Sequence, residues 1–407
     1  MKKKILFVIN TLGRAGAETA LIALLKELPQ EKFDIYIYVL MGQGELISDL
    51  PPYVKVINKK YCYKSVLSCD GKRRLFVTVL KHCFAHFSIL KNAGYLISNL
   101  AEMIKNKQLK HFDKLMWKIV SDGALRIKDE FDLAIAYLEG GSTYYVDDHV
   151  TAKKKAAFIH IDYEKAGYTR KLDKDCYLKF DRIFTVSDEV KQHFLNIYGE
   201  CDKNTKVFHN LLDTDRILKL SKQAMDKDGQ ALFNRSKNCL KIVTVGRLTY
   251  QKGYDVAIQA LKVLVDKGLD ICWFVIGEGP EHKALSTQIK ALGLEKRFFL
   301  VGAKSNPYPY YKAADLYVHA TRFEGKSIAI QEAQILGCCI IASDCSGNRE
   351  QIENGIDGIL CPFSKEGISS AIMKLTDKPL NLKKYGHNAA QRTINHTDEL
   401  NYIYELL

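Results

Sequence analysis

Residues 316–342 read LYVHATRFEGKSIAIQEAQILGCCIIA, and this stretch decides the fold. The apolar run from Leu316 to His319 has the length and composition of a buried strand. After a polar turn, apolar residues recur at helical spacing from Ser327 to Leu336, and Gly337 marks the end of the helix. The next apolar run, from Cys339 to Ala342, predicts a second strand. A strand, a helix and a strand in this order predict a parallel α/β unit.

The same alternation of strands and helices occurs twice along the chain, which has 407 residues. Further strands are expected at Lys4 to Ile9, Asp34 to Leu40, Leu133 to Tyr137, Ala156 to Ile159, Arg182 to Val186, Lys241 to Val245, Ile271 to Ile276 and Phe298 to Val301. Helices between such strands imply parallel sheets that are covered on both faces. A chain of this length exceeds one ordinary core and suits two α/β domains. We place the boundary near Asn210, ahead of a polar, lysine-rich connection at residues 221–237.

Two glutamates of the quoted stretch, Glu324 and Glu332, are candidates for ligand binding. The first lies in the polar turn and the second inside the predicted helix, so the two carboxylates can flank one ligand. Free backbone N–H groups at the start of the helix favour an anion between them. Sugars and phosphates fit this arrangement together. The spacing alone is also typical of a solvated helix face or of an acid/base couple, and both interpretations stay open at this point.

A second candidate site lies upstream, where residues 243–253 read VTVGRLTYQKG. An apolar strand ends at Gly246, and the loop that follows holds Arg247 and Lys252. Arginine offers a fork for two phosphate oxygens, and lysine offers a mobile point charge. Open α/β sheets bind their ligands at the carboxyl ends of strands. The pattern therefore predicts a site for a diphosphate.

These residues resemble family four of the retaining glycosyltransferases. The resemblance rests on Gly246-Arg247 with Lys252-Gly253, followed by the pattern from Glu324 to Glu332. Further matches are Asn10 to Thr19 after the first strand, His160 within residues 158–162, the strand end at residues 184–187, and His209-Asn210 ahead of Asp213. The first of these departs from the usual form, since Ala15 stands where family members often carry a second adjacent glycine.

The resemblance implies a GT-B fold, in which two Rossmann-like domains face each other across a deep cleft. Residues 1–209 are expected to form the acceptor-binding domain, and residues 210–387 the domain that binds the nucleotide-sugar donor. A C-terminal helix at residues 388–407 is expected to pack back on the first domain.

The resemblance also implies roles for individual residues. Arg247 and Lys252 would grip the diphosphate, Glu332 the ribose hydroxyls, and Glu324 a hydroxyl of the transferred sugar. The catalytic set is then His160, Arg247, Lys252 and Glu324, and the donor-binding set is Gly16, Arg247, Lys252, Glu324, Gly325, Lys326, Ser327 and Glu332.

Within the donor-binding set, the backbone amides of residues 325–327 would meet sugar and phosphate oxygens, and Gly16 would let its loop approach the diphosphate. His160 would lie near the donor sugar, and a buried histidine satisfied by backbone groups is the alternative. Glu139 and Asp162 are expected on the acceptor side.

The family's mechanism implies retention of the anomeric configuration by a front-face attack, in which the leaving phosphate takes the proton of the acceptor. No metal and no cofactor are expected beyond the nucleotide-diphospho-sugar itself, which we expect to be a UDP-sugar. Asp213-Thr214-Asp215 looks like the metal-binding motif of the other glycosyltransferase fold. Because it lies at the connection between the domains, it is not expected to bind a metal.

The form Glu324-Gly325-Lys326-Ser327, with a lysine where many relatives carry an apolar residue, resembles the capsular and exopolysaccharide branch. The expected acceptor is a saccharide or a lipid-linked saccharide in bacterial surface polysaccharide assembly. Two alternatives stay open: another GT-B enzyme such as a nucleotide-sugar epimerase, and a non-catalytic carbohydrate-binding relative. A nicotinamide-dependent enzyme fits poorly, because the glycines near Gly13 and Gly277 do not complete G-x-G-x-x-G.

The net charge of +13 is concentrated in residues 55–128, which hold sixteen Lys and Arg against four Asp and Glu. Residues 74–81 and 109–118 mix basic and large apolar side chains at helical spacing. This pattern predicts contact with an anionic membrane surface, and a solvated face over ordinary core packing is the alternative. No nucleic-acid-binding motif accompanies the charge, so we expect no nucleic acid partner. The pattern says nothing of the oligomeric state.

The expected location is the cytoplasm, with peripheral attachment to the inner face of the plasma membrane. The eleven cysteines include no C-x-x-C pair, which favours a reducing compartment. The basic start at residues 1–4 precedes only a short apolar run, so we expect a first strand there and not a signal peptide.

Overall fold

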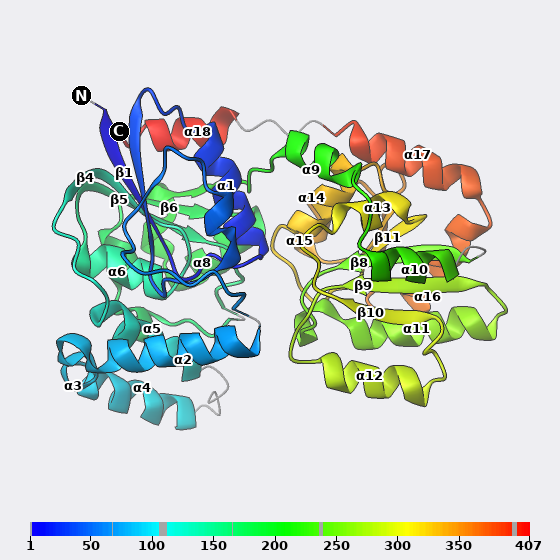
Figure 1. The fold of residues 1–407 in the computed structure, drawn as a ribbon, viewed down its shortest axis with the longest axis horizontal. Coiled ribbons are helices and arrows are strands. Elements are labelled where there is room, and N and C mark those ends of the chain that lie inside the picture. Colours follow the sequence, from blue (N-terminus) through cyan, green and yellow to red (C-terminus); the bar gives the residue numbers. More distant parts are fainter. Residues whose placement is uncertain (1, 67, 106–111, 165, 236–238, 393–396) are drawn as a thin grey trace. The chain divides into compact units, whose positions relative to one another are not determined.

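The chain folds into two compact α/β units in the computed structural model (Figure 1). The structure describes residues 2–66, 68–105, 112–164, 166–235, 239–392 and 397–407. The first unit comprises Met1–Leu212 and Asn395–Leu407, and the second comprises Asp213–Ile394. The division lies a few residues after the predicted boundary at Asn210. The expected cleft between the units stays a prediction.

The first unit is built on a seven-stranded parallel sheet with the order β3-β2-β1-β4-β5-β6-β7. Its strands are β1 Lys3–Ile9, β2 Phe33–Val39, β3 Lys55–Val56, β4 Glu130–Ala136, β5 Thr151–Ile159, β6 Arg182–Thr185 and β7 Thr205–Val207. The order reverses between β1 and β4, and open α/β sheets bind ligands beside such a reversal. Ile5 on β1 lies opposite Ile35 on β2 and Leu133 on β4, and all three are buried. Apolar runs of this kind form central strands because both faces of the sheet are covered.

Helices cover this sheet and connect its strands in the first unit. Those between neighbouring strands are α1 Gly16–Glu27, η1 Glu45–Asp49, α6 Gly141–His149, α7 Arg170–Asp173, η4 Cys176–Lys179, α8 Asp188–Ile197 and η5 Gly199–Asn204. A further helical layer is inserted between β3 and β4, made of α2 Cys69–Phe84, η2 Ala85–Phe87, α3 Ser88–Lys91, α4 Ala93–Lys105 and α5 Phe112–Asp122. Residues 74–81 of the predicted basic segments lie in α2. Of residues 109–118, the first three lie outside the described residues and the rest in α5.

The C-terminal helix returns to the first unit as predicted, but it is shorter than expected. Helix α17, Pro379–Ala390, still belongs to the second unit, and α18, Thr397–Tyr404, belongs to the first. On α18, the Tyr404 ring stacks on Phe33 of β2 with centroids 5.9 Å apart, and Ile403 is fully buried. The predicted single helix at residues 388–407 is therefore wrong, since two helices with separate cores share that range.

The second unit is built on a six-stranded parallel sheet with the order β10-β9-β8-β11-β12-β13. Its strands are β8 Leu240–Val245, β9 Ile271–Ile276, β10 Phe298–Gly302, β11 Leu316–His319, β12 Ile340–Ser343 and β13 Ile359–Cys361. The quoted stretch forms β11, helix α14 (Ile328–Ile335) and β12, as its pattern predicts. The strand order reverses between β8 and β11, so the loops that follow these two strands flank the reversal.

The remaining helices of the second unit cover both faces of its sheet. They are α9 Thr214–Ser221, α10 Lys227–Arg235, η6 Tyr250–Lys252, α11 Tyr254–Asp266, α12 His282–Ala291, α13 Tyr308–Ala313, α15 Ser346–Arg349 and α16 Lys365–Thr376. In either unit, none of the helices within the described residues is long and apolar enough to cross a bilayer.

Candidate functional site

The second unit brings its two candidate motifs together at the carboxyl ends of β8 and β11. These strands pair in parallel, with Leu316 opposite Ile242 and Tyr317 opposite Val243. The loop after β8 passes through η6 and turns into α11 at Gly253, whose φ of 59° places it in the left-handed region. A Cβ atom at Gly253 would lie 2.6 Å from the Phe363 ring, so both backbone conformation and space require glycine there.

Hydrogen bonds join this loop to the one that follows β11. The backbone N–H of Arg322 donates to the carbonyl of Gln251 at 2.8 Å, and the Gln251 side-chain amide donates to the carbonyl of Phe323 at 2.9 Å. The Arg322 guanidinium binds both carboxylate oxygens of Asp255, at 2.9 and 2.6 Å, and lies 3.9 Å from the centroid of the Tyr250 ring. Bidentate pairing fixes orientation as well as distance. Arg322 is therefore a positioning residue, and this role was not predicted from the sequence.

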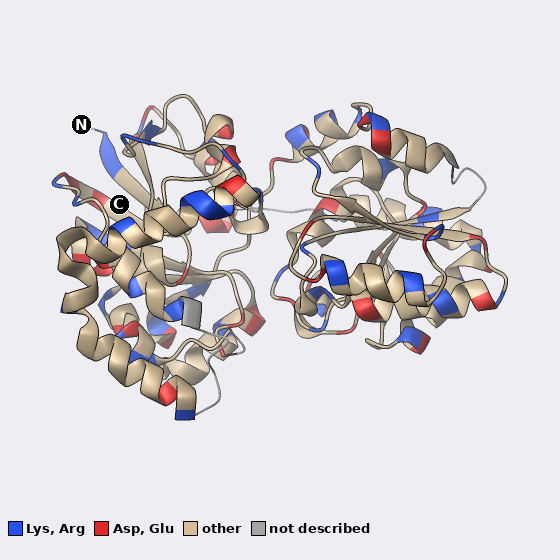
Figure 2. Cartoon of the chain, turned by 60° about the horizontal axis from the view of Figure 1, so that its bottom comes forward, with Lys and Arg blue, Asp and Glu red and all other residues tan. Residues whose placement is uncertain are grey.

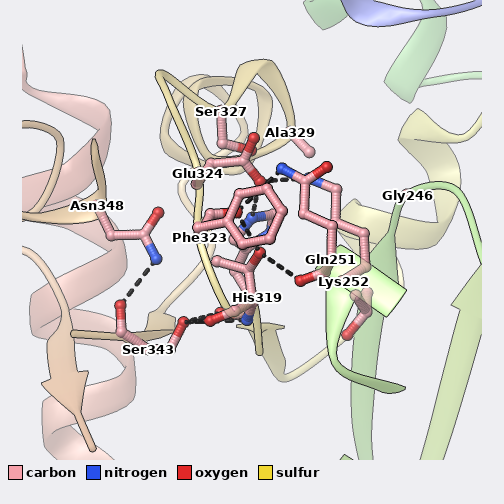
Figure 3. A network of polar contacts seen from close by, with 12 residues as sticks. Gly246, Gln251, Lys252, His319, Phe323, Glu324, Ser327, Ala329, Ser343 and Asn348 are labelled. Carbon is pink, nitrogen blue, oxygen red and sulfur yellow. Dashed lines mark hydrogen bonds and ion pairs between the residues drawn. The ribbon is translucent and has the colours of Figure 1, made fainter. Parts of the chain in front are cut away.

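Glu324 lies at the centre of the polar network in Figure 3. Its carboxylate contacts the Lys252 ammonium and accepts a hydrogen bond from His319 Nε2 at 3.0 Å. The side chains of Lys252 and Glu324 are only 18% and 13% exposed. Burial alone raises the pKa of Glu324, but the Lys252 charge and the His319 hydrogen bond outweigh it and hold that pKa at about 2. Glu324 is therefore a permanent anion at neutral pH.

His319 extends the network toward the interior of the unit. Burial, followed by the Lys252 charge, lowers the pKa of His319, so its imidazole is neutral at pH 7. Because ionised Glu324 only accepts, His319 Nε2 carries the proton and Nδ1 accepts from the Tyr317 hydroxyl at 3.1 Å. His319 and Tyr317 were not predicted as site residues. Their spacing of two on one strand, which puts them on the same face of the sheet, was the available signal.

Arg247 differs from Lys252 because it is exposed at the end of β8. Within the described ranges, no hydrogen bond or ion pair holds its guanidinium. One cation of the predicted diphosphate site is thus engaged by a carboxylate, while the other is open to an incoming anion.

Glu332, the second glutamate of the pair, has quite different surroundings. It lies on α14 and is buried, and its two oxygens accept hydrogen bonds from the Tyr308 and Tyr311 hydroxyls, each at 3.0 Å. Burial raises the pKa of Glu332 to about 7, against the two hydrogen bonds, which lower it. A carboxylate oxygen has a second lone pair, so both oxygens can still accept from a ligand hydroxyl.

The three residues after Glu324 are only partly open to a ligand. The N–H of Ser327 donates to Gln351 Oε1 at 2.8 Å, and Gln351 Nε2 donates back to the Ser327 carbonyl at 2.9 Å. This differs from the expectation of a free Ser327 amide, because a side chain from beyond β12 already satisfies it. A Cβ atom at Gly347 would lie 1.7 Å from the Gly325 carbonyl oxygen, so the Glu324–Gly325 turn rests on α15. Lys326 is half-buried.

In the first unit, predicted residues meet at the carboxyl ends of β1, β4 and β5. The Glu139 carboxylate accepts from the backbone N–H of His160 at 3.1 Å. Asn10 Nδ2 donates to the Glu139 carbonyl at 3.2 Å, and Asn10 Oδ1 accepts from the N–H of Ser142 at 2.7 Å. Burial raises the pKa of Glu139. Asn10 therefore fixes the turn that carries Glu139.

The ring of His160 stacks on Phe158, with centroids 5.8 Å apart. Burial lowers the pKa of His160 to about 4, so the imidazole is neutral. Its Nε2 atom is buried, and the described residues offer it no hydrogen-bond partner. Buried polar atoms are nearly always paired in native proteins. An open Nε2 argues against the alternative of a histidine that backbone groups satisfy completely.

The other predicted residues of the first unit lie beside this point. Gly16 is exposed and begins α1, whose N-cap residue Ala15 supplies no side-chain cap. Asp162 Oδ2 lies 2.8 Å from Nδ1 of His193 on α8. Glu189 lies close to both, which gives a group of potential metal ligands.

A second such group, Asp122, Asp148 and His149, already surrounds an ammonium. Lys118 Nζ lies 2.6 Å from Asp122 and 3.1 Å from Asp148. The Asp213-Thr214-Asp215 motif belongs to neither group. Asp213 caps α9 by accepting from the N–H of Arg216 at 2.9 Å. This capping role accounts for its aspartate without a metal.

The segment that holds the polar network matches a known family. Residues 230–392 match the family model described as glycosyl transferases group 1. An uncharacterized glycosyltransferase of Methanocaldococcus jannaschii is 28% identical over 220 residues, which is 50% of this chain and 53% of the relative.

Two bacterial relatives match over similar or shorter segments. The UDP-Gal:alpha-D-GlcNAc-diphosphoundecaprenol alpha-1,3-galactosyltransferase of Escherichia coli is 28% identical, over 38% of this chain and 41% of the relative. The N-acetylgalactosamine-N,N'-diacetylbacillosaminyl-diphospho-undecaprenol 4-alpha-N-acetylgalactosaminyltransferase of Campylobacter jejuni is 26% identical, over 57% of this chain and 60% of the relative. The chain thus matches about half the length of these curated relatives.

Solved structures match over almost the whole chain. Anabaena Alr3699/HepE in complex with UDP has a TM-score of 0.68 at 18% identity, covering 100% of this chain and 99% of that one. WaaG, a glycosyltransferase involved in lipopolysaccharide biosynthesis, has a TM-score of 0.62 at 15% identity, covering 99% of each chain. The chain has the GT-B fold, and its second unit matches glycosyl transferases group 1 over the segment that holds Arg247, Lys252, Glu324 and Glu332.

Proposed function

We propose that the chain is a retaining glycosyltransferase that moves a sugar from a UDP-sugar to a saccharide or lipid-linked saccharide in bacterial surface polysaccharide assembly. The observation that carries the proposal is the contact between Lys252 and Glu324, beside the exposed Arg247. The family match over the same segment supports it. Two relatives are named for diphosphoundecaprenol substrates and one structural neighbour contains UDP, which supports the donor and acceptor classes.

The cations act on the leaving group. As the bond between the anomeric carbon and the phosphate oxygen breaks, negative charge grows on the diphosphate, and Arg247 and Lys252 stabilise it. Donors fixed before the reaction stabilise such charge most effectively, because they need no reorganisation. Hydrogen bonds between the loop that contains η6 and residues 320–327 hold Lys252 in place.

Glu324 holds the transferred sugar. As a permanent anion it can only accept, so a sugar hydroxyl donates to it. Lys252 and His319 already bind this carboxylate, which suits it to holding and not to nucleophilic attack. The acceptor hydroxyl then forms the new bond to the anomeric carbon on the face that the phosphate leaves, and its proton passes to the phosphate. No metal is required by this scheme, because the two cations neutralise the diphosphate.

The first unit is proposed to bind the acceptor near Glu139 and Asp162, and His160 keeps its predicted role at the transferred sugar. The neutral imidazole of His160 offers an unused nitrogen, and the buried Glu139 carboxyl has a raised pKa. Both suit hydrogen bonds to sugar hydroxyls.

A panel of nucleotide-sugars tests the proposal. The full chain is first screened by thermal shift, since a specific ligand stabilises it by RT ln(1 + [L]/Kd). Nucleotide release is then measured with the donor that binds best, for the wild type, Glu324→Gln and Arg247→Gln, with Lys262→Gln on α11 as a surface control. We expect both site variants to lose release and the control to keep it.

The product decides between the remaining alternatives. Proton NMR of the transferred sugar reports its anomeric configuration, and inversion would contradict the retaining mechanism. Conversion of the donor into an isomeric nucleotide-sugar without transfer would indicate an epimerase. Binding without any turnover would indicate a carbohydrate-binding relative.

A further inference from the structure

We infer that helices α2, α3 and α4 of the first unit form a docking face for an anionic phospholipid membrane surface. The proposal goes beyond the transfer reaction and can fail independently of it. Figure 2 turns the lower side of Figure 1 forward and colours the charges of this helical layer. We call the outward side of the three helices the α2–α4 face.

Large apolar side chains occupy the solvent side of α2. Phe76, Leu80 and Phe84 recur every four residues, so they lie on one side of the helix. Phe84 is 73% exposed. Leu75 and Val79, on the other side, pack against the core of the unit. The inner side of α2 thus packs on the core, and the outer apolar row has no packing partner among the residues that the structure describes.

The turn after α2 adds a further exposed aromatic side chain to the apolar row, and its backbone is strained. His86 and Phe87 both have positive φ, at 53° and 56°, a conformation that residues other than glycine rarely adopt. The turn presents Phe87 to solvent, 70% exposed, and Leu90 on α3 is equally exposed. Strained backbone of this kind clusters at functional sites.

Helix α4 adds Ile97 and Ile104, which lie seven residues apart on its outer side. Single exposed apolar residues are ordinary, but contiguous sets on a monomer mark interaction sites. Residues 76–104 contain nine of the large apolar side chains that stay exposed in the described chain. The concentration in one inserted layer therefore indicates a surface that binds something apolar.

The basic residues of α2, α3 and α4 indicate which kind of apolar partner this face binds. Helices α2, α3 and α4 carry six exposed basic residues, namely Lys72, Arg73, Arg74, Lys81, Lys91 and Lys105. None of the six has an ion pair within the described residues. The two acids of these helices are engaged by lysines from elsewhere, Asp70 by Lys64 at 2.5 Å and Glu102 by Lys171 at 2.7 Å.

The basic residues of α2 lie on both sides of its apolar row. At 100° per residue, Lys72 falls on one border of the apolar row and Lys81 and Arg74 on the other. Aromatic and aliphatic side chains flanked by lysine and arginine are the pattern of helices that lie in a membrane interface. A second copy of the chain would bring like charges together, and a nucleic acid would leave the apolar row unburied. Anionic lipid satisfies both features at once.

Flotation with vesicles tests the proposal on the full chain. The vesicles contain phosphatidylcholine alone, or phosphatidylcholine with about one third phosphatidylglycerol. We expect binding to the anionic vesicles, weak binding to the neutral ones, and loss of binding in high salt. Equal binding to both vesicle types, or to neither, would overturn the proposal.

Two variants separate the apolar row from the charges. Phe84→Ser with Phe87→Ser and Leu90→Ser is expected to abolish flotation. Lys72→Gln with Arg73→Gln and Lys81→Gln is expected to weaken it by roughly fivefold for each charge removed. The matched control is Leu380→Ser with Lys383→Gln and Lys384→Gln on α17, where Leu380 is 83% exposed. It should float like the wild type.

The same variants also test whether a partner other than a membrane binds the α2–α4 face. All these residues are exposed, so circular dichroism and thermal melts should match the wild type, and a variant that unfolds is replaced by the single substitution Phe84→Ser. If size-exclusion chromatography showed a dimer that Phe84→Ser dissociates, or if the chain bound single-stranded RNA more tightly than anionic vesicles, the membrane assignment would be wrong. Nucleotide release from the free donor should stay unchanged in both variants.

Discussion

Glu324 and Glu332 lie eight residues apart on one loop and helix, both are largely shielded from solvent, and their pKa values are shifted in opposite directions. Lys252 and His319 hold the pKa of Glu324 at about 2, whereas Glu332 accepts hydrogen bonds from the Tyr308 and Tyr311 hydroxyls and has a pKa of about 7. Burial raises the pKa of both. The difference therefore comes from the partners, because a cation compensates the lost hydration of a carboxylate and two neutral hydroxyls do so only in part.

The two glutamates can therefore make different hydrogen bonds to a ligand. Glu324 is ionised at neutral pH, so its carboxylate only accepts hydrogen bonds. Glu332 changes its protonation near neutral pH, so it can accept from a ligand hydroxyl or donate to one. Substitution of single partners tests whether they cause this difference in pKa.

The largest effect is expected from Lys252→Met, which removes the cation of Glu324 at nearly constant volume. The variant loses one stabilising charge on the leaving diphosphate and leaves a buried carboxylate without its counter-ion. We expect kcat/KM for nucleotide release to fall by about 10²–10³. The control is Lys262→Met, because Lys262 pairs with Asp266 on the surface of α11. Equal rates for the two variants would contradict the role of Lys252.

The next effect is on stability as a function of pH. For Glu332, the folded pKa of about 7 exceeds the usual 4.5, so its contribution to stability is complete below pH 4.5 and is lost as pH rises through 7. The loss amounts to roughly 3 kcal/mol. Glu332→Gln cannot ionise, so it should gain stability relative to the wild type between pH 5 and 8, as measured by urea denaturation.

Glu324→Gln should show the opposite sign in the same experiment. The folded pKa of Glu324 is depressed, so its contribution is present above pH 4.5 and is lost as pH falls toward 2. The variant should therefore be less stable than the wild type at pH 7 and approach it in acid. Parallel pH profiles for the two variants would refute the contrast between the two sites.

The sequence predicted the frame of this site better than its details. The strands that lead into it are apolar runs, and β8, β11 and β12 were located to within two residues. Arg247, Lys252 and Glu324 each follow a predicted strand, and the sequence therefore indicated a site at the carboxyl ends of strands.

The partners of the two glutamates were not predictable in the same way. Tyr308 and Tyr311 come from α13, whose place against α14 depends on packing between distant segments. Gln351, which closes on Ser327, comes from beyond another strand. Helix α2 has apolar side chains on two sides, and its packing against α5 decides which side faces the core. The amphipathic pattern alone did not show which side would stay exposed.

A smaller effect is expected from His319→Leu, which tests whether His319 supports Glu324. The variant removes the hydrogen bond to the carboxylate but keeps Lys252, so the pKa of Glu324 should rise. We expect kcat/KM to fall on the order of tenfold, in line with a lost charge-assisted hydrogen bond. The acidic limb of the pH–rate profile should also move to higher pH, which a purely structural role would not cause. Tyr317→Phe, which keeps the bond between His319 and Glu324, serves as the control.

The smallest effect is expected from Tyr308→Phe, which removes one of the two hydrogen bonds to Glu332. The ionised carboxylate loses more from this change than the neutral acid, so the pKa of Glu332 should rise. The fall in stability should still begin near pH 4.5, the usual value, but should extend to higher pH than in the wild type. The loss of one hydrogen bond costs about 1 kcal/mol. Tyr310→Phe is the matched control on the same helix, because its hydroxyl donates to Asp226 at 2.6 Å. If both variants shifted the pH midpoint equally, the Tyr308 hydroxyl would have no specific effect on the pKa of Glu332, and the contrast with Glu324 would rest on Lys252 and His319 alone.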